Sequence, residues 1–100
     1  MNYFVQWSGP AFRRLESLPQ RLAFEIIRRT DLLSTFPELG NDLASRFEQL
    51  AGLRHLIVDR RWRVIYDVDE KKSTIRILVV QSCRQKLPSK RIVKKLKEDR

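Results

Sequence analysis

The segment 60–80, "RRWRVIYDVDEKKSTIRILVV", joins two runs of alternating bulky residues through a charged turn. Alternation with a period of two predicts β-strands, and two such runs around a short polar turn predict an antiparallel hairpin. The hairpin opens with three arginines around Trp62, although a sheet needs no cations there for its own stability. These cations raise the question of an anionic partner.

The period-two pattern extends on both sides of this hairpin. The preceding segment "LRHLIVD" alternates in the same way, and near the start of the chain Tyr3, Val5 and Trp7 alternate with Phe4 and Gln6. An opening strand is therefore expected before a three-stranded antiparallel meander. The meander should have strands over 53–59, 61–68 and 73–82, joined by tight turns at 59–61 and 69–72.

Two helices are expected between the opening strand and the meander. Ser8 and Pro10 are typical of a helix start, an apolar stripe at helical spacing follows, and Pro19 ends the helix. A second amphipathic pattern predicts a helix from about residue 20 to about residue 34. The segment 41–52, "NDLASRFEQLAG", fits either a short helix capped by Asp42 or a loop held by its apolar side chains.

This order of elements predicts an α+β fold with the helix pair packed on one face of the sheet and the other face open. One hundred residues are the size of one small domain, so we expect a single domain over 1–100. Its last part, 88–100, has Ile92, Val93 and Leu96 at helical spacing among lysines. A basic C-terminal helix or tail is expected there.

The formal charge of +9 is concentrated near the C-terminus, where residues 84–100 contain eight basic residues and two acidic ones. Such a cluster suits a polyanion, and it equally suits a solvated tail that keeps the protein soluble. No apolar run reaches the roughly 18 residues of a membrane span, so we expect a cytoplasmic protein without a membrane partner. With Cys83 as the single cysteine, neither a disulfide nor a structural metal site is expected, and no cofactor is predicted.

Four stretches together resemble the RelE/ParE superfamily of bacterial type II toxins: "FPELGNDL", "LAGLRHLIV", "RWRVIYDVD" and "IRILVV". The resemblance covers almost the whole chain, and it implies a toxin that inhibits growth and is held by a cognate antitoxin. RelE-like members are metal-free, ribosome-dependent mRNA endonucleases that block translation, whereas ParE-like members inhibit DNA gyrase. The short helical pair is more similar to the RelE-like branch.

The chain departs from the RelE-like pattern in two places. That pattern often has histidine or lysine followed by arginine after the last strand, where this chain has Ser82 and Cys83. An aromatic hydroxyl usually follows a few residues later, where "QKLPSK" offers only Ser89. The departures leave two alternatives to a RelE-like nuclease, namely a gyrase inhibitor and a non-catalytic RNA-binding homologue.

Cleavage of RNA without a metal needs cations for the charge of the phosphorane and groups that move protons. If Val64, Tyr66 and Val68 face the helices, Arg63 points to the open face, where its guanidinium suits a phosphate. The alternative is a surface ion pair of Arg63 with an aspartate of its own hairpin, Asp67 or Asp69.

His55 is the only histidine and the only side chain expected to titrate near neutrality. It shares the open face with Arg63 if Leu56 and Val58 pack inward, and the opposite parity buries it beside Leu53. Arg63, His55 and Arg84 are therefore the candidate catalytic residues. Trp62 suits either stacking on a base or core packing, and the candidate RNA-binding residues are Arg54, Arg60, Arg61, Trp62, Lys86, Lys90 and Arg91.

Overall fold

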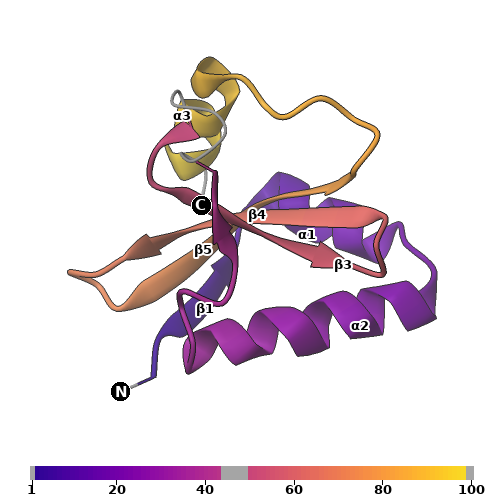
Figure 1. Cartoon of the computed structure of the whole chain (residues 1–100), viewed down its shortest axis with the longest axis horizontal. Coiled ribbons are helices and arrows are strands. Elements are labelled where there is room, and N and C mark those ends of the chain that lie inside the picture. The colour runs from indigo at the N-terminus through magenta and orange to yellow at the C-terminus, as the bar shows by residue number, and fades with distance from the viewer. Residues whose placement is uncertain (1, 44–49, 99–100) are drawn as a thin grey trace.

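The computed structural model describes residues 2–43 and 50–98 of the chain. Within these residues, five strands and three α-helices follow one another, and apart from the short strand β2 their order is the predicted α+β order (Figure 1). Their bounds are β1 Phe4–Trp7, α1 Gly9–Glu16, α2 Gln20–Asp31 with the 3-10 turn η1 Leu32–Ser34, β2 Asn41–Asp42, β3 Leu53–Val58, β4 Trp62–Asp69, β5 Thr74–Ser82 and α3 Lys90–Glu98. Within the described residues, no helix combines the length and the apolar composition needed to cross a membrane.

The helical hairpin predicted after the first strand is present. Ser8 caps α1, because its hydroxyl oxygen accepts the N–H of Ala11 at 3.1 Å while its O–H donates to the carbonyl of Leu78 at 2.9 Å. Pro10 lies in the first turn of α1, where a missing N–H costs nothing. The cap therefore fixes the start of α1 and also fastens it to β5.

The strands form one sheet in the order β1-β5-β4-β3-β2. β1 runs parallel to β5, and β3, β4 and β5 form the predicted antiparallel meander. The two-residue strand β2 was not predicted, and it pairs Asn41 with His55 and Asp42 with Arg54. Residues 44–49 lie outside the described part of the chain, so the choice between a helix and a loop over 41–52 stays open there.

The second face is not as open as expected, because α3 covers part of it. Helices α1 and α2 cover one face over a core that includes Ile26, Val64 and Tyr66. On the opposite face, Val93 of α3 packs in a second buried cluster with the sheet residues Leu53, Ile65 and Leu78 and with Leu43 and Leu50. The amphipathic spacing of α3 indicated a helix, and that helix lies beside the sheet (Figure 1) with its apolar residues Val93 and Leu96 in the second cluster.

A change of register in the β4–β5 pair supplies apolar residues to both faces. Ile65 pairs with Val79, whereas the next residue, Tyr66, pairs with Ile77, so Leu78 has no residue opposite it. Such a β-bulge lets two neighbouring residues point to the same side. Leu78 and Val79 accordingly both pack in the second cluster.

An ion-pair cluster fastens the end of α3 to the sheet. Asp67 is almost fully buried, and its carboxylate accepts from the guanidinium of Arg76 at 2.8 and 2.5 Å. The ammonium of Lys97 lies 3.5 Å from the same carboxylate. The Asp67 carboxylate raises the pKa of Arg76. Two cations thus compensate the one buried carboxylate.

Tyr66 holds the loop before β2 through its buried hydroxyl. This group donates to the carbonyl of Pro37 at 2.8 Å and accepts the N–H of Gly40 at 2.8 Å, and burial raises the pKa of the phenol. Arg54 adds a third bond, from its Nη1 to the carbonyl of Gly40 at 2.7 Å. A Cβ on Gly40 would lie 2.7 Å from both the Tyr66 hydroxyl and the carbonyl of His55, so only glycine fits.

Gly40→Ala should therefore lower the free energy of unfolding by about 2 kcal/mol or more, because the added methyl group displaces the loop and disrupts its hydrogen bonds. Gly52→Ala is the matched control, since Gly52 has open space around it and a φ of +86°. That control should cost only about 1 kcal/mol of backbone strain. Urea unfolding of both variants checks the prediction, and an equal loss for the two would contradict it.

Candidate functional site

Arg63 lies near the start of β4 on the same sheet face as Ile65, as predicted, and it pairs with Ile57 of β3 and Gln81 of β5. Its side chain is partly buried, and its Nη1 donates to the amide oxygen of Gln81 at 2.9 Å. Its Nε is buried and has no hydrogen-bond partner among the described residues.

The alternative partners of Arg63 are engaged elsewhere. Asp67 is bonded to Arg76, and the carboxylate of Asp69 accepts the backbone N–H of Lys72 at 3.1 Å. Within residues 2–43 and 50–98, the hydrogen bond of the Arg63 guanidinium is therefore to a neutral amide. Its positive charge remains available to a ligand.

His55 lies in the middle of β3, between Asn41 of β2 and Ile65 of β4. Opposite residues of an antiparallel pair point to the same side, so the imidazole shares its face with Ile65 and Arg63. Residues diagonal to each other across such a pair lie roughly 7–8 Å apart at their Cα atoms, within reach of long side chains. The parity that places His55 beside Arg63 is confirmed, because Leu56 and Val58 are buried on the helix side.

The segment after β5 carries exposed cations and is bonded to Arg61 and to Gln81, the partner of Arg63. The N–H of Cys83 donates to the carbonyl of Arg61 at 2.8 Å, and the carbonyl of Lys86 accepts from the amide of Gln81 at 3.2 Å. These two bonds hold the segment against the start of β4. The side chains of Arg84 and Lys86 are exposed on it, and those of Lys90 and Arg91 are exposed at the start of α3.

Two predicted RNA-binding residues lie on the opposite face. Arg54 pairs with Tyr66 across the sheet, so its side chain is on the helix side, bonded to Gly40. Trp62 packs against the helix-side core, and the guanidinium of Arg14 lies 5.2 Å from the centre of its ring. This arrangement agrees with the packing interpretation of Trp62 rather than with stacking on a base.

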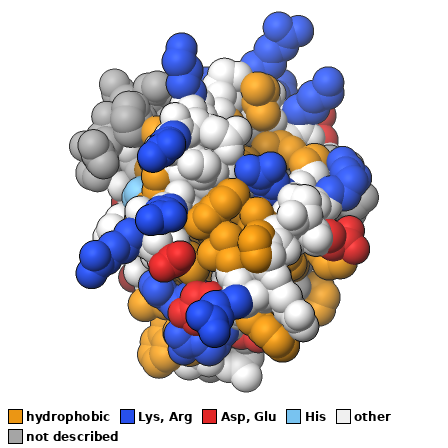
Figure 2. Space-filling model, turned by 90° about the vertical axis from the view of Figure 1, so that its right-hand side faces the viewer, with side chains coloured by type: hydrophobic (Ala, Val, Ile, Leu, Met, Phe, Trp, Pro, Cys, Tyr) orange, Lys and Arg blue, Asp and Glu red, His pale blue; other side chains and the backbone are white. Residues whose placement is uncertain are grey.

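Arg60 and Arg61 are exposed at the turn between β3 and β4. Asp59 and Arg60 both have positive φ, 52° and 59°, as the two central residues of a type I′ turn do, and the N–H of Arg61 donates to the carbonyl of Val58 at 3.3 Å. The turn directs both arginines outward at the same end of the sheet as Arg63. Figure 2 shows a face on which Lys and Arg side chains, together with a few Asp and Glu side chains, lie around a central group of hydrophobic ones.

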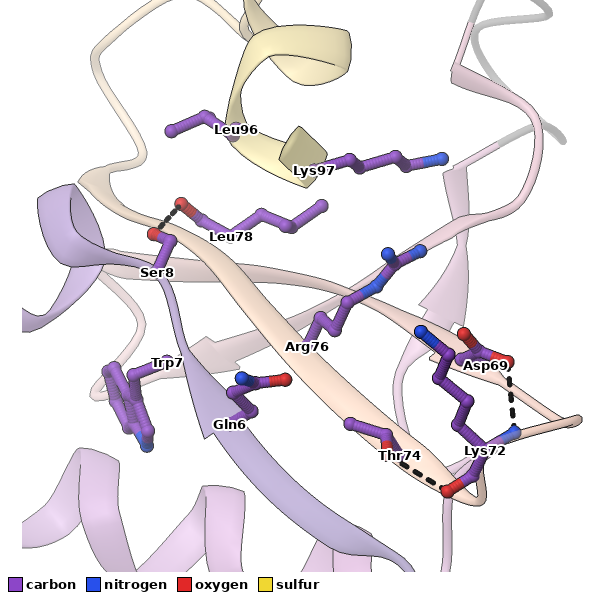
Figure 3. A pocket seen from close by; sticks show the side chains of 10 residues that line it. All are labelled: Gln6, Trp7, Ser8, Asp69, Lys72, Thr74, Arg76, Leu78, Leu96 and Lys97. Atoms are coloured by element: carbon purple, nitrogen blue, oxygen red, sulfur yellow. Dashed lines mark hydrogen bonds between the residues drawn. The ribbon is translucent and has the colours of Figure 1, made fainter. Parts of the chain in front are cut away.

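Two hollows of the described structure lie away from the candidate residues. A cavity of about 190 Å³ lies between the β1–β5 edge and the end of α3, lined by Gln6, Ser8, Lys72, Arg76 and Lys97 among others (Figure 3). A wider apolar groove runs between α2 and the β3–β4 turn, and its lining includes Leu22, Phe24, Ile27, Arg61 and Trp62. Neither hollow contains Arg63, His55 or Arg84.

A protein-family model described as the ParE toxin of a type II toxin–antitoxin system, parDE, matches residues 5–87. The chain belongs to the RelE/ParE superfamily of toxins. A comparison with curated proteins finds no match. The match to the family model agrees with the resemblance to the RelE/ParE superfamily that the sequence of the central hairpin indicated.

Solved structures agree with this membership. A chain of the Mycobacterium tuberculosis toxin–antitoxin complex RelBE2 is 30% identical, the match covers 82% of this toxin and 99% of that chain, and the TM-score is 0.68. A mutant of the E. coli toxin RelE in the free state is 15% identical. The match covers 84% of this toxin and 86% of that chain, and the TM-score is 0.70. A chain of the archaeal RelE–RelB complex from Pyrococcus horikoshii is 22% identical. The match covers 86% of this toxin and 100% of that chain, and the TM-score is 0.61. These last two likenesses concern the fold.

Gln81 is the residue that sequence reasoning missed. It is only 7% exposed and contacts Arg63 directly, yet in the sequence it is one polar residue at the end of a long apolar strand. A signal was present, because a polar residue in a run of buried strand positions needs a hydrogen-bonding partner. Identifying Arg63 as that partner requires the register of β4 against β5.

Proposed function

We propose that this toxin cleaves mRNA on the ribosome by metal-free attack of a 2′-hydroxyl on the adjacent phosphate. The attack forms a 2′,3′-cyclic phosphate and breaks the bond from phosphorus to the 5′-oxygen of the next nucleotide, which leaves as a hydroxyl after taking a proton from water. One observation carries the proposal: Arg63 is held on the sheet by an uncharged amide, on the same face as His55. A cation that is oriented but not neutralised is what the developing charge of a phosphorane requires. Because ribosomes and mRNA are cytoplasmic in bacteria, the proposal assigns the toxin to the cytoplasm.

Each candidate residue has a distinct role in this proposal. Arg63 stabilises the phosphorane, and His55 takes the proton of the attacking hydroxyl. Arg84 and Lys86 hold the flanking phosphates of the mRNA, while Lys90 and Arg91 extend the contact to the ribosomal RNA. Arg60 and Arg61 border the same surface at the β3–β4 turn.

DNA gyrase is the alternative target. The matching family model is described as that of the ParE toxin. In addition, this chain has Ser82 and Cys83 where RelE-like nucleases often have basic residues. A gyrase inhibitor needs no constellation that cleaves RNA. A third alternative, a non-catalytic RNA-binding homologue, would keep the basic surface and lack the chemistry.

Induced expression followed by mapping of mRNA 5′ ends separates these functions. New 5′ ends that appear within coding regions, and only during translation, would support the nuclease. DNA damage that depends on gyrase, without new 5′ ends, would support the ParE-like activity. If neither result is seen at full soluble expression, the non-catalytic RNA-binding homologue is the alternative that remains.

We also propose that a cognate antitoxin covers part of this toxin, since the M. tuberculosis and P. horikoshii structures are complexes of toxin and antitoxin. The groove between α2 and the β3–β4 turn offers apolar side chains such as Phe24 and Ile27, with Arg21 and Arg61 at its border. An amphipathic segment with acidic residues fits such a lining. Co-purification with the product of a short acidic reading frame beside the toxin gene tests this partner.

Replacing Arg84, Lys86, Lys90 and Arg91 with glutamine should weaken ribosome binding and flatten its salt dependence. Removing one cation that binds a single-stranded phosphate reduces the log–log slope by about 0.7, so removing four reduces it by up to about 3. A matched control removes four other exposed cations, Arg13, Arg21, Lys71 and Lys72. An equal change of slope in the control would show that net charge, and not this segment, determines binding.

A further inference from the structure

Gln81 is one of the few buried polar side chains on the sheet, and both ends of its amide are engaged. Its Oε1 accepts from Nη1 of Arg63 at 2.9 Å, and its Nε2 donates to the carbonyl of Lys86 at 3.2 Å. With 7% of its surface exposed, it has little contact with water. An amide bonded at both ends inside a protein is fixed in orientation, because a flip would break both bonds.

This amide joins three parts of the molecule. Arg63 belongs to β4, Gln81 to β5, and Lys86 to the segment that presents exposed cations before α3. The same segment is fastened to the start of β4 by the bond between Cys83 and Arg61. The orientation of the Arg63 guanidinium is therefore coupled to the position of Arg84 and Lys86.

The partner of Arg63 is neutral, and a second strand pair shows the contrast. Across the same two strands, Asp67 lies opposite Arg76 and forms a two-bond ion pair with it. A carboxylate satisfies a guanidinium strongly and cancels its charge. An amide accepts one bond and leaves the full positive charge, which suits a group that must meet a phosphate.

We propose that Gln81 is a positioning residue, which fixes the guanidinium of Arg63 relative to the basic segment 84–86 while leaving its charge available. This inference rests on the proposed RNA cleavage for its catalytic meaning, whereas the orientation of Arg63 is measurable without any substrate. Gln81 contacts no substrate itself and acts through Arg63.

The first test replaces Gln81 with methionine, which has a similar length and forms neither hydrogen bond. In ¹⁵N NMR spectra, the guanidinium of Arg63 should show slowed rotation in the wild type and fast rotation in Gln81→Met. The turnover number for mRNA cleavage on programmed ribosomes should fall by about tenfold with an unchanged KM, since misplacing a catalytic group costs up to about 10²-fold. Gln85→Met is the control, because Gln85 bonds the N–H of Ser82 in the same segment and does not touch Arg63.

Two further variants separate positioning from stability. In an Arg63→Ala background, Gln81→Met should have no additional effect on cleavage, whereas an independent structural role would give a multiplicative loss. Gln81→Glu should keep the guanidinium ordered and still lower cleavage by about tenfold or more, because the carboxylate neutralises the cation and has no N–H to donate to the carbonyl of Lys86.

The results of these variants show whether Gln81 positions Arg63. Unchanged rotation of the Arg63 guanidinium in Gln81→Met would overturn it, as would a multiplicative loss in the double variant or full activity of Gln81→Glu. If the wild type cleaves no mRNA, the proposed function fails, and the NMR comparison alone then decides whether Gln81 orients Arg63.

Discussion

Replacing Arg63 with alanine should reduce mRNA cleavage on programmed ribosomes by about 10²–10³-fold and abolish toxicity at equal soluble expression. This is the loss expected when one preorganised donor to the transition state is removed. The guanidinium is partly buried, so the change also leaves the amide oxygen of Gln81 without its partner. That loss should lower the free energy of unfolding by about 1–2 kcal/mol, which is too little to explain inactivity in a domain of ordinary stability.

The control for Arg63→Ala is Arg76→Ala, on the neighbouring strand. Arg76 bonds the buried carboxylate of Asp67, and removing it should destabilise the fold by more than Arg63→Ala does. Cleavage per folded molecule should nevertheless be kept in Arg76→Ala. Arg63→Lys should recover only part of the activity, because a point charge cannot replace the planar fork. Equal cleavage by Arg63→Ala and the wild type would eliminate the proposed role.

The elements that sequence predicted correctly are those with local causes. Ser8, Pro10 and Pro19 determine where the helices of the hairpin begin and end, and the period-two runs determine the meander. The parity of β4 followed from the same alternation, which places Val64 and Tyr66 in one core and Ile65 in the other. Each of these features depends on residues a few positions apart.

The features that were missed depend on contacts between distant parts of the chain. Strand β2 is only two residues long and exists because the loop before it is held by Tyr66, which is 26 residues from Gly40. The bulge at Leu78 breaks the alternation of β5 and moves two apolar residues to the second face. That apolar surface is then covered by α3, so the face expected to be open is covered in part.

The candidate site was predicted in part for the same reasons. Alternation alone put Arg63 and His55 on one face, and it also implied that Arg54, the neighbour of His55, lies on the other face. Grouping Arg54 with the RNA-binding residues went against that parity. Trp62 follows the same rule and packs on the helix side. Gln81 needed the cross-strand register, which the bulge shifts by one residue.

Replacing His55 with glutamine should lower the cleavage rate by about 10²-fold or more, the usual scale of general acid–base catalysis, with ribosome binding little changed. His55 lies diagonal to Arg63 on the same sheet face, so a phosphate held by Arg63 brings its neighbouring 2′-hydroxyl toward the imidazole. Glutamine keeps the approximate size and the capacity for hydrogen bonds, and it does not titrate near neutrality. The loss in His55→Gln should therefore persist across the pH range of the measurement, because the amide accepts no proton.

The measurement is single-turnover cleavage on programmed ribosomes from about pH 5.5 to about pH 8, the range in which an imidazole titrates. Leu56→Ala, at the next position of β3, is the stability control, because it opens a cavity in the helix-side core and leaves the imidazole in place. If His55→Gln cuts at the wild-type rate with the wild-type pH profile, His55 is structural. Arg63 and Arg84 would then act by position and charge alone, and the proton would have to pass to a group outside this face, such as one supplied by the ribosome.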